Sequence, residues 1–268
     1  MEIVGKIVDR AVKAVLFDFD GTISTLRHGW ESVMEPMMIE MIAGNAEPDG
    51  EIVKRVREYI DESTGIQTIH QMKWLAEEVR RQGRNPGMPA DPWWYKAEYN
   101  RRLMLRLADR KAEVLSGKKR AEEFLMAGAE AFLQELCARG VKVYVASGTD
   151  DADVAEEAEL LGVRKYFTAL KGAMPGSERC SKEETLRMLA REAGLQGAEM
   201  AVFGDGKVEI ALGAAMGALT VGVASDEEAR HGINRAKRSR LLKAHADVIV
   251  GDFLEREALM KLLGMGER

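Results

Sequence analysis

The chain has 268 residues, of which 46% are hydrophobic and 31% are charged, and its formal net charge at pH 7 is −5. This length suits one large domain or a core domain with a smaller insert, and the apolar fraction is sufficient for a sizeable core. The net negative charge argues against a nucleic-acid-binding protein, which usually carries a basic surplus. We find no apolar signal-peptide core and no apolar run long enough to span a membrane. We therefore expect a cytoplasmic protein with neither nucleic acid nor a membrane as a partner.

The two cysteines, Cys137 and Cys180, do not have the spacing of metal ligands. Cys137 lies in an apolar helical pattern, so we expect it to be a small core residue. A disulfide framework is not expected, which suits a reducing cytoplasm.

Short apolar runs predict buried parallel strands, because they are rich in aliphatic residues and show little alternation. The runs are Lys13–Phe19, Val141–Ser147, Met200–Asp205, Leu219–Ala224 and Asp247–Val250. Helical patterns alternate with these runs from residue 128 onward, at Gly128–Arg139, Asp151–Leu161, Ser181–Ala193 and Lys207–Met216. This alternation predicts an α/β fold with a doubly wound, Rossmann-like parallel sheet.

The first two strands are separated by well over a hundred residues, too many for a structureless connection. Four segments between them have apolar residues at helical spacing: Trp30–Met41, Glu51–Ile60, Thr68–Val79 and Tyr95–Ala108. We therefore predict a core domain formed by residues 1–25 and 123–268, with a helical domain inserted at residues 26–122.

The first predicted strand ends in two acids, Asp18 and Asp20, within the string Phe-Asp-Phe-Asp-Gly-Thr. Alternate positions on a strand face the same side, so both carboxylates can approach one site at the carboxyl end of the strand. Two adjacent carboxylates repel each other, and a divalent cation such as Mg²⁺ relieves that repulsion with hard oxygen ligands. Gly21 permits the tight turn that follows. The alternative, an ordinary acidic turn, would suit a lone Asp-x-Asp better than this longer string.

Three further signals stand at predicted strand or helix ends. Ser147, Gly148 and Thr149 close the second strand, where a hydroxyl and backbone N–H groups can bind a phosphoryl oxygen. Lys182 falls in the first turn of a helix that Ser181 and Glu184 can cap, a position that favours anions. Lys171, after an apparent strand, is the rival lysine.

The last signal is Gly204-Asp205-Gly206, followed by a second acid, Glu209. The glycines allow the backbone to approach a metal site closely. Glu209 either contacts the metal or binds a metal-bound water or the ammonium of Lys182.

The string DFDGTIS resembles motif I of the haloacid dehalogenase superfamily, and the later signals resemble its motifs II to IV in the expected order. Together they cover residues 13–25 and 128–252. The overall pattern is similar to that of the phosphoglycolate phosphatase-like members, whose helical C1-type cap follows motif I. The resemblance implies a fold with such a cap at the insert.

The resemblance also implies an activity and a set of site residues. Asp18 would be the nucleophile, Asp20 the acid and base, and Lys182 a catalytic and phosphate-binding cation. The resemblance further implies substrate contacts from Thr22, Ser147, Gly148, Thr149 and Lys182, and Mg²⁺ binding by Asp18, Asp20, Asp205 and Glu209.

The expected protein is therefore a Mg²⁺-dependent phosphatase acting on a small phosphorylated metabolite through an aspartyl-phosphate. Because Asp20 is present, phosphate-ester chemistry is favoured over dehalogenation. Alternatives are a phosphomutase of the same superfamily and a non-catalytic metabolite-binding protein. The sequence does not select the substrate, and it is compatible with a monomer or a homodimer.

Overall fold

The structure is a computed structural model that describes residues 1–5, 7–47, 49–179, 181–192 and 194–266, with the side chains of residues 181, 189, 190 and 192 left aside. The chain divides into two compact units. We call Met1–His28 together with Val114–Arg268 the α/β unit, and Gly29–Glu113 the helical unit. Each is described by itself.

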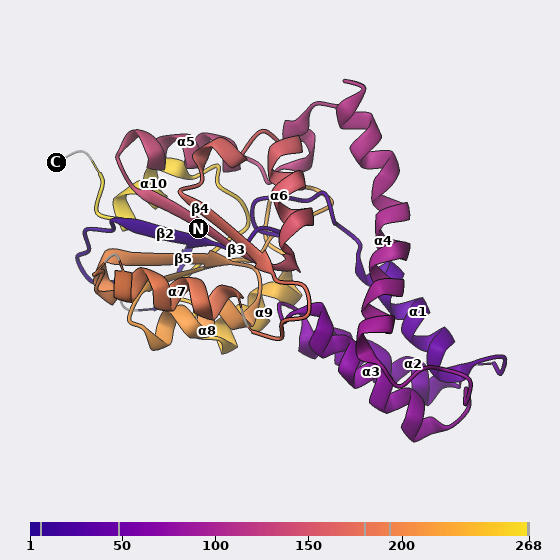
Figure 1. The fold of residues 1–268 in the computed structure, drawn as a ribbon. Helices are drawn as coiled ribbons and strands as arrows, with labels where there is room; N and C mark the ends of the chain where they lie inside the picture. The colour runs from indigo at the N-terminus through magenta and orange to yellow at the C-terminus, as the bar shows by residue number, and fades with distance from the viewer. Residues whose placement is uncertain (6, 48, 180, 193, 267–268) are drawn as a thin grey trace. The chain divides into compact units, whose positions relative to one another are not determined.

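The described part of the α/β unit contains a seven-stranded sheet with the order β1-β7-β6-β5-β2-β3-β4 (Figure 1). The strands are β1 (Glu2–Ile3), β2 (Ala14–Phe17), β3 (Lys142–Asp150), β4 (Ala169–Ala173), β5 (Met200–Gly204), β6 (Leu219–Val223) and β7 (Val248–Val250). All neighbouring strands pair in parallel except β1, which is antiparallel to β7. The predicted α/β class with a doubly wound parallel sheet is confirmed, and the short edge strand β1 is an addition to it.

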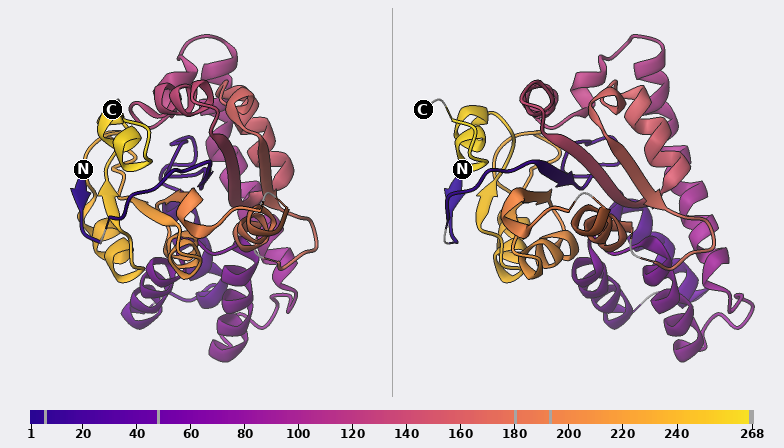
Figure 2. Two further views of the ribbon diagram at one scale, coloured as in Figure 1. Left: turned by 90° about the vertical axis from the view of Figure 1, so that its left-hand side faces the viewer. Right: turned by 60° about the vertical axis from the view of Figure 1, so that its left-hand side comes forward.

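Helices cover both faces of this sheet (Figures 1 and 2). One face packs against α5 (Ala129–Ala138), α6 (Asp151–Leu160) and α10 (Arg256–Leu262). The other packs against α7 (Ser181–Glu192), α8 (Lys207–Ala215) and α9 (Arg235–Lys243). Short 3₁₀ segments lie at Ala121–Phe124, Arg164–Tyr166 and Gly197–Glu199. Both faces of the central strands are therefore buried, which explains their nearly continuous apolar sequences.

Strand β2 shows how the core is divided between the two faces. Phe17 points toward α5, where its ring stacks on Phe203 at 4.9 Å between centroids and meets Phe132 edge-on. Its neighbour Leu16 points to the opposite face and joins the cluster of Leu186 on α7. Alternation along the strand thus fills two apolar layers.

The expectation for Cys137 is wrong: this residue on α5 is exposed, and its Sγ donates to the backbone oxygen of Tyr166 at 3.3 Å. The apolar face of α5 is formed instead by Phe132, Leu133 and Leu136. Cys180 lies outside the described residues.

The register of the central strands positions the candidate residues. Phe17 at the end of β2 is level with Val145 on β3 and with Phe203 on β5. The residues that follow these three positions therefore emerge at the same edge of the sheet, where ligands bind in open α/β sheets.

The helical unit contains α1 (Glu31–Ala43), α2 (Gly50–Ser63), α3 (Thr68–Gln82) and most of α4 (Pro92–Leu115). The four predicted helices are present, and their ends differ by up to seven residues, at the carboxyl end of α4. Methionine and branched aliphatic side chains dominate the core, with two tyrosines: Met34, Met37, Met38, Met41, Ile42, Ile52, Val56, Ile60, Met72, Leu75, Val79, Tyr95, Tyr99, Leu103 and Leu107. None of the helices in the described ranges is both long and apolar enough to cross a membrane.

Candidate active site

Asp18 stands directly after β2 and is 5% exposed. Its Oδ1 accepts a hydrogen bond from the backbone N–H of Phe19 at 2.8 Å, and its Oδ2 accepts one from Lys182 Nζ at 2.8 Å. Burial raises the pKa of Asp18 well above its usual value, although the ammonium of Lys182 opposes this rise. The carboxylate form therefore needs positive charge close by.

Lys182 reaches the site from the first turn of α7 and is 3% exposed. Its Nζ donates to Asp18 Oδ2 and to Glu209 Oε2, both at 2.8 Å. Burial alone would lower the pKa of Lys182, but the two carboxylates outweigh it and raise the pKa, so the ammonium form is stable. The rival Lys171 is exposed on β4, where its Nζ lies 3.7 Å from the sulfur of Met188. The geometry therefore favours Lys182.

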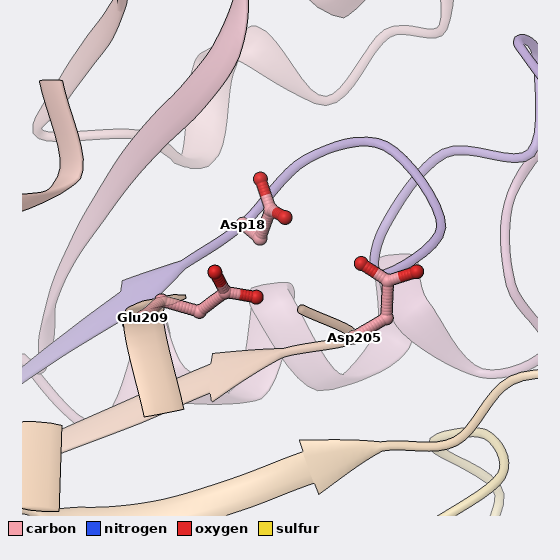
Figure 3. Close-up of side chains that lie close together, drawn as sticks. All are labelled: Asp18, Asp205 and Glu209. Atoms are coloured by element: carbon pink, nitrogen blue, oxygen red, sulfur yellow. The ribbon is translucent and has the colours of Figure 1, made fainter. Parts of the chain in front are cut away.

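The side chains of Asp18, Asp205 and Glu209 converge from β2, from the end of β5 and from α8 (Figure 3). Each offers a carboxylate oxygen, and these oxygens lie within 4.8 Å of one another. Glu209 also accepts from the backbone N–H of Gly206 at 2.6 Å, and a Cβ on Gly204 would lie 2.3 Å from its Cγ. Glycine before Asp205 thus gives Glu209 the room to reach Lys182.

These residues fit a hard divalent cation. The donors are carboxylate oxygens, which Mg²⁺ prefers. Lys182 lies between the carboxylates of Asp18 and Glu209, and a second lysine, Lys237, is shared between Asp205 and a further carboxylate, Glu227. These four carboxylates carry more negative charge than the two ammonium groups balance. A cation held by Asp18 and Asp205 would restore the balance.

Gly21 makes the turn after β2 with a φ of +72°, in the left-handed region that favours glycine. A Cβ at this position would lie 2.4 Å from Asp205 Oδ2. Both the turn and the close approach of Asp205 therefore require glycine in the Asp-x-Asp-Gly string.

Asp20 is held by the end of β3. Its Oδ2 accepts from the hydroxyl of Thr149 at 2.8 Å and from that of Ser147 at 3.3 Å. Thr149 and Ser147 lie at an irregularity in the pairing of β3 with β4, between Ala146 and Asp150. Burial is the main cause that raises the pKa of Asp20 to about 6. A carboxyl group with this pKa can give and take a proton near neutral pH.

Arg27 is a buried arginine close to Asp20. Arg27 binds Glu157 on α6 with two hydrogen bonds, from Nε at 2.9 Å and from Nη2 at 2.8 Å, and Glu157 is 0% exposed. Arg27 Nε also lies 3.8 Å from Asp20 Oδ1. The segment after the first motif is thereby tied to the helix after the second.

A second buried lysine contacts Asp205. Lys237 on α9 donates from Nζ to Asp205 Oδ2 at 2.7 Å, to Glu227 Oε1 at 2.7 Å and to the hydroxyl of Ser225 at 3.0 Å. From the sequence alone, the basic stretch Arg230–Lys243 is typical of a solvated helix. For Lys237 that interpretation is wrong, because its side chain is only 12% exposed. No feature of the sequence distinguishes it from the other basic residues of this stretch.

Thr22 takes a different place from the other candidates. Its side chain is fully buried, and among the described residues its hydroxyl has no hydrogen-bond partner. A substrate contact by Thr22 therefore has no support from this geometry. The expected capping of α7 by Ser181 involves a side chain outside those described.

Arg27, Glu157, Glu227 and Lys237 were missed at the sequence level. They come from segments without a recognisable motif, and only the fold brings them beside Asp20 and Asp205. Charged residues along a helix are typical of a solvent-exposed face. The sequence alone does not show which of them the tertiary structure buries.

The sheet topology and the four converging motifs define a hydrolase of the haloacid dehalogenase type. Residues 12–217 match the family of haloacid dehalogenase-like hydrolases. The chain belongs to this family, so the predicted superfamily and the prediction of an enzyme are confirmed.

The chain is also similar to individual known proteins, although the sequence identities are low. The chain is 25% identical over 218 residues to the phosphoglycolate phosphatases of Shigella sonnei and Escherichia coli K12, covering 79% of this chain and 81% of each relative. The crystal structure of a predicted phosphoglycolate phosphatase from Haemophilus somnus 129Pt has a TM-score of 0.64 and 16% identity, covering 93% of this chain and 98% of that one. The β-phosphoglucomutase of Clostridium difficile also has a TM-score of 0.64, with 14% identity and 94% and 97% coverage. These two structures show that the fold is shared.

Proposed function

We propose that this enzyme is a Mg²⁺-dependent phosphatase that hydrolyses a phosphate monoester of a small metabolite through an aspartyl-phosphate on Asp18. The observation that carries the proposal is the arrangement around Asp18, where Lys182 Nζ stands at 2.8 Å and the oxygens of Asp205 and Glu209 lie within 4.8 Å. A carboxylate nucleophile, a buried cation and a candidate metal site are the parts that phosphoryl transfer needs.

In the first half-reaction a carboxylate oxygen of Asp18 attacks phosphorus, and the bond between phosphorus and the ester oxygen breaks. Asp20 gives its proton to the leaving oxygen, which departs as an alcohol. The raised pKa of Asp20, about 6, supports this role because a fraction of the group is protonated near neutral pH. Lys182 balances negative charge at Asp18 during the attack.

In the second half-reaction a water molecule attacks phosphorus while Asp20 takes its proton. The bond from phosphorus to Asp18 breaks, and orthophosphate and the free carboxylate are regenerated. The hydroxyls of Thr149 and Ser147 hold Asp20 in one orientation through both halves. Ser147, Gly148 and Thr149 stand beside Asp20 at the strand end and are proposed to bind the phosphoryl oxygens.

Asp18 and Asp205 are the side chains proposed to hold Mg²⁺, together with the backbone carbonyl of Asp20. The bound ion would polarise the phosphate and offset its repulsion by Asp18. Glu209 uses both carboxylate oxygens, for Lys182 and for the backbone N–H of Gly206. We therefore assign to Glu209 the positioning of Lys182.

The helical insert, predicted at residues 26–122, is proposed to act as a cap domain. An insert at this place would restrict large substrates and exclude water during the reaction. Small phosphorylated acids and sugars are therefore the substrates to test, beginning with 2-phosphoglycolate because the curated relatives carry that name.

The test is release of orthophosphate from an aryl phosphate and from a panel of small phosphate esters. We expect release with Mg²⁺, none after EDTA, and recovery when Mg²⁺ is restored. Asp18→Asn should abolish release because the amide is a poor nucleophile. Asp9→Asn, the same change at an exposed position, should keep wild-type activity. Full activity in Asp18→Asn would disprove the proposed nucleophile.

The same panel addresses the phosphomutase alternative. A mutase would interconvert phosphate isomers with little net release and would depend on a bisphosphate activator. Phosphate release without such an activator would favour the phosphatase.

A further inference from the structure

The side chain of Lys237 contacts the carboxylate of Asp205, which we propose as a ligand of Mg²⁺. Its Nζ lies 2.7 Å from Asp205 Oδ2, and both side chains are 12% exposed. The third partner, Glu227, lies at 2.7 Å and is also 12% exposed. The ammonium is thus shared between two carboxylates in a largely buried environment.

The two carboxylates outweigh the cost of burying the amine and raise the pKa of Lys237. The two short contacts with carboxylates are those of an ammonium group. The same side chain donates to the hydroxyl of Ser225, which donates in turn to the backbone oxygen of Gly21. The ammonium is fixed between the first motif and Asp205.

We propose that Lys237 acts as an internal counter-ion of Asp205 and thereby lowers the affinity of the site for Mg²⁺. The inference rests on the proposed function, because it takes Asp205 as a metal ligand. Without the metal, the ammonium neutralises much of the charge on Asp205. When a divalent cation binds the same carboxylate, the two positive charges repel each other.

Glu227 has the opposite effect. It shares the ammonium of Lys237 and so reduces the positive charge that Asp205 and a bound cation experience. Removing the charge of Glu227 should weaken Mg²⁺ binding, whereas removing the charge of Lys237 should strengthen it. These opposite signs separate an electrostatic role from a structural one, because loosening the site would weaken binding in both variants.

The experiment is a titration of the metal-free, full-length protein with MgCl₂, in which the thermal unfolding midpoint reports binding. We expect the dissociation constant of Lys237→Met to fall by about three- to tenfold and that of Glu227→Gln to rise by about twofold or more. Lys237→Arg keeps the charge and should stay within about twofold of wild type. Lys243→Met removes an exposed lysine of the same helix and should have no effect.

Each outcome has one meaning. Equal or weaker Mg²⁺ binding by Lys237→Met, when wild type binds the ion, would overturn the inference and leave the proposed function standing. If wild type does not bind Mg²⁺, the metal assignment itself fails. If Lys237→Met does not fold, Glu227→Gln decides, and tighter binding by that variant would contradict the inference.

Discussion

The two units of this enzyme place their charged groups differently. In the α/β unit, Lys182, Glu209 and Glu157 are 3%, 1% and 0% exposed, and all three lie near the carboxyl ends of the strands. In the helical unit the core is dominated by methionine and aliphatic residues, and ion pairs such as Arg101–Glu98 and Lys54–Glu58 lie toward the surface.

Glu78 of the helical unit is 4% exposed, but its partners Arg55 and Arg81 are 45% and 54% exposed. The charge of this group is therefore balanced from the solvent side. Complete burial of an ion pair costs desolvation free energy, and the attraction between the two charges does not always compensate for it. For Glu78 the helical unit avoids most of that cost, and the α/β unit accepts it beside the proposed nucleophile and proton donor.

The largest expected effect that tests this contrast is that of Arg27→Met. The substitution leaves the fully buried Glu157 without the two hydrogen bonds at 2.8 and 2.9 Å. Breaking one partner of a buried pair typically costs about 3–5 kcal/mol, and we expect a loss of that size in the free energy of unfolding. Urea titration followed by far-ultraviolet circular dichroism measures it.

The control for Arg27→Met is the double variant Arg27→Met/Glu157→Leu. Replacing both partners by apolar groups removes the uncompensated charge and should restore most of the lost stability. If the double variant is as unstable as the single one, the burial of Glu157 is not what makes Arg27 important.

The next expected effect, in the helical unit, is that of Met38→Ala. Met38 is fully buried in the cluster of α1 with α2 and α3. Truncating a buried methionine leaves a cavity and costs about 2–5 kcal/mol.

The four tryptophans provide a selective reporter for Met38→Ala, because all of them lie in the helical unit: Trp30, Trp74, Trp93 and Trp94. Tryptophan fluorescence in urea should therefore show the loss. Met174→Ala, at an exposed position of the α/β unit, should leave that transition unchanged. A fluorescence transition unaffected by Met38→Ala would mean that the core of the helical unit tolerates the cavity.

The sequence predicted the sheet because its strands are buried on both faces. Val15, Leu16 and Phe17 read as an uninterrupted apolar run, and the acids after them mark the strand end. Asp18, Lys182 and Asp205 were predictable as candidates since each stands at the end of a strand or the start of a helix. Strand β1 was missed because Glu2–Ile3 is too short to form a pattern.

The rest of the site depends on tertiary contacts. Arg27 and Glu157 are 130 positions apart, and neither has a local pattern that predicts burial. Lys237 lies in a basic stretch whose sequence predicts a solvated helix. In the structure α9 packs beside β6, and this lysine contacts Asp205. Cys137 shows the reverse error, because an apolar pattern of moderate length does not fix which side of a helix is covered.

The smallest expected effect concerns ion pairs near the surface of the helical unit. Glu98 accepts hydrogen bonds from Arg101 and Arg102 at 2.7 Å, which lower its pKa below its usual value. Surface pairs of this kind contribute about 0.2–1 kcal/mol, so Glu98→Gln should lose no more than that at pH 7. Lys54→Ala, which breaks a more exposed pair 3.8 Å apart, is the control and should lose less.

The pH dependence of the Glu98→Gln effect shows whether the ionised carboxylate of Glu98 stabilises the folded protein. The pKa of Glu98 is lower in the folded protein than in the unfolded chain, where it is about 4.3. The ionised group therefore stabilises the fold above about pH 4.3, and this contribution is lost as the pH falls below that value. The difference in unfolding free energy between wild type and Glu98→Gln, followed by tryptophan fluorescence, should be constant from pH 7 to 5 and shrink below it. A difference above 2 kcal/mol, or one that grows on acidification, would show that the helical unit relies on charge as the α/β unit does.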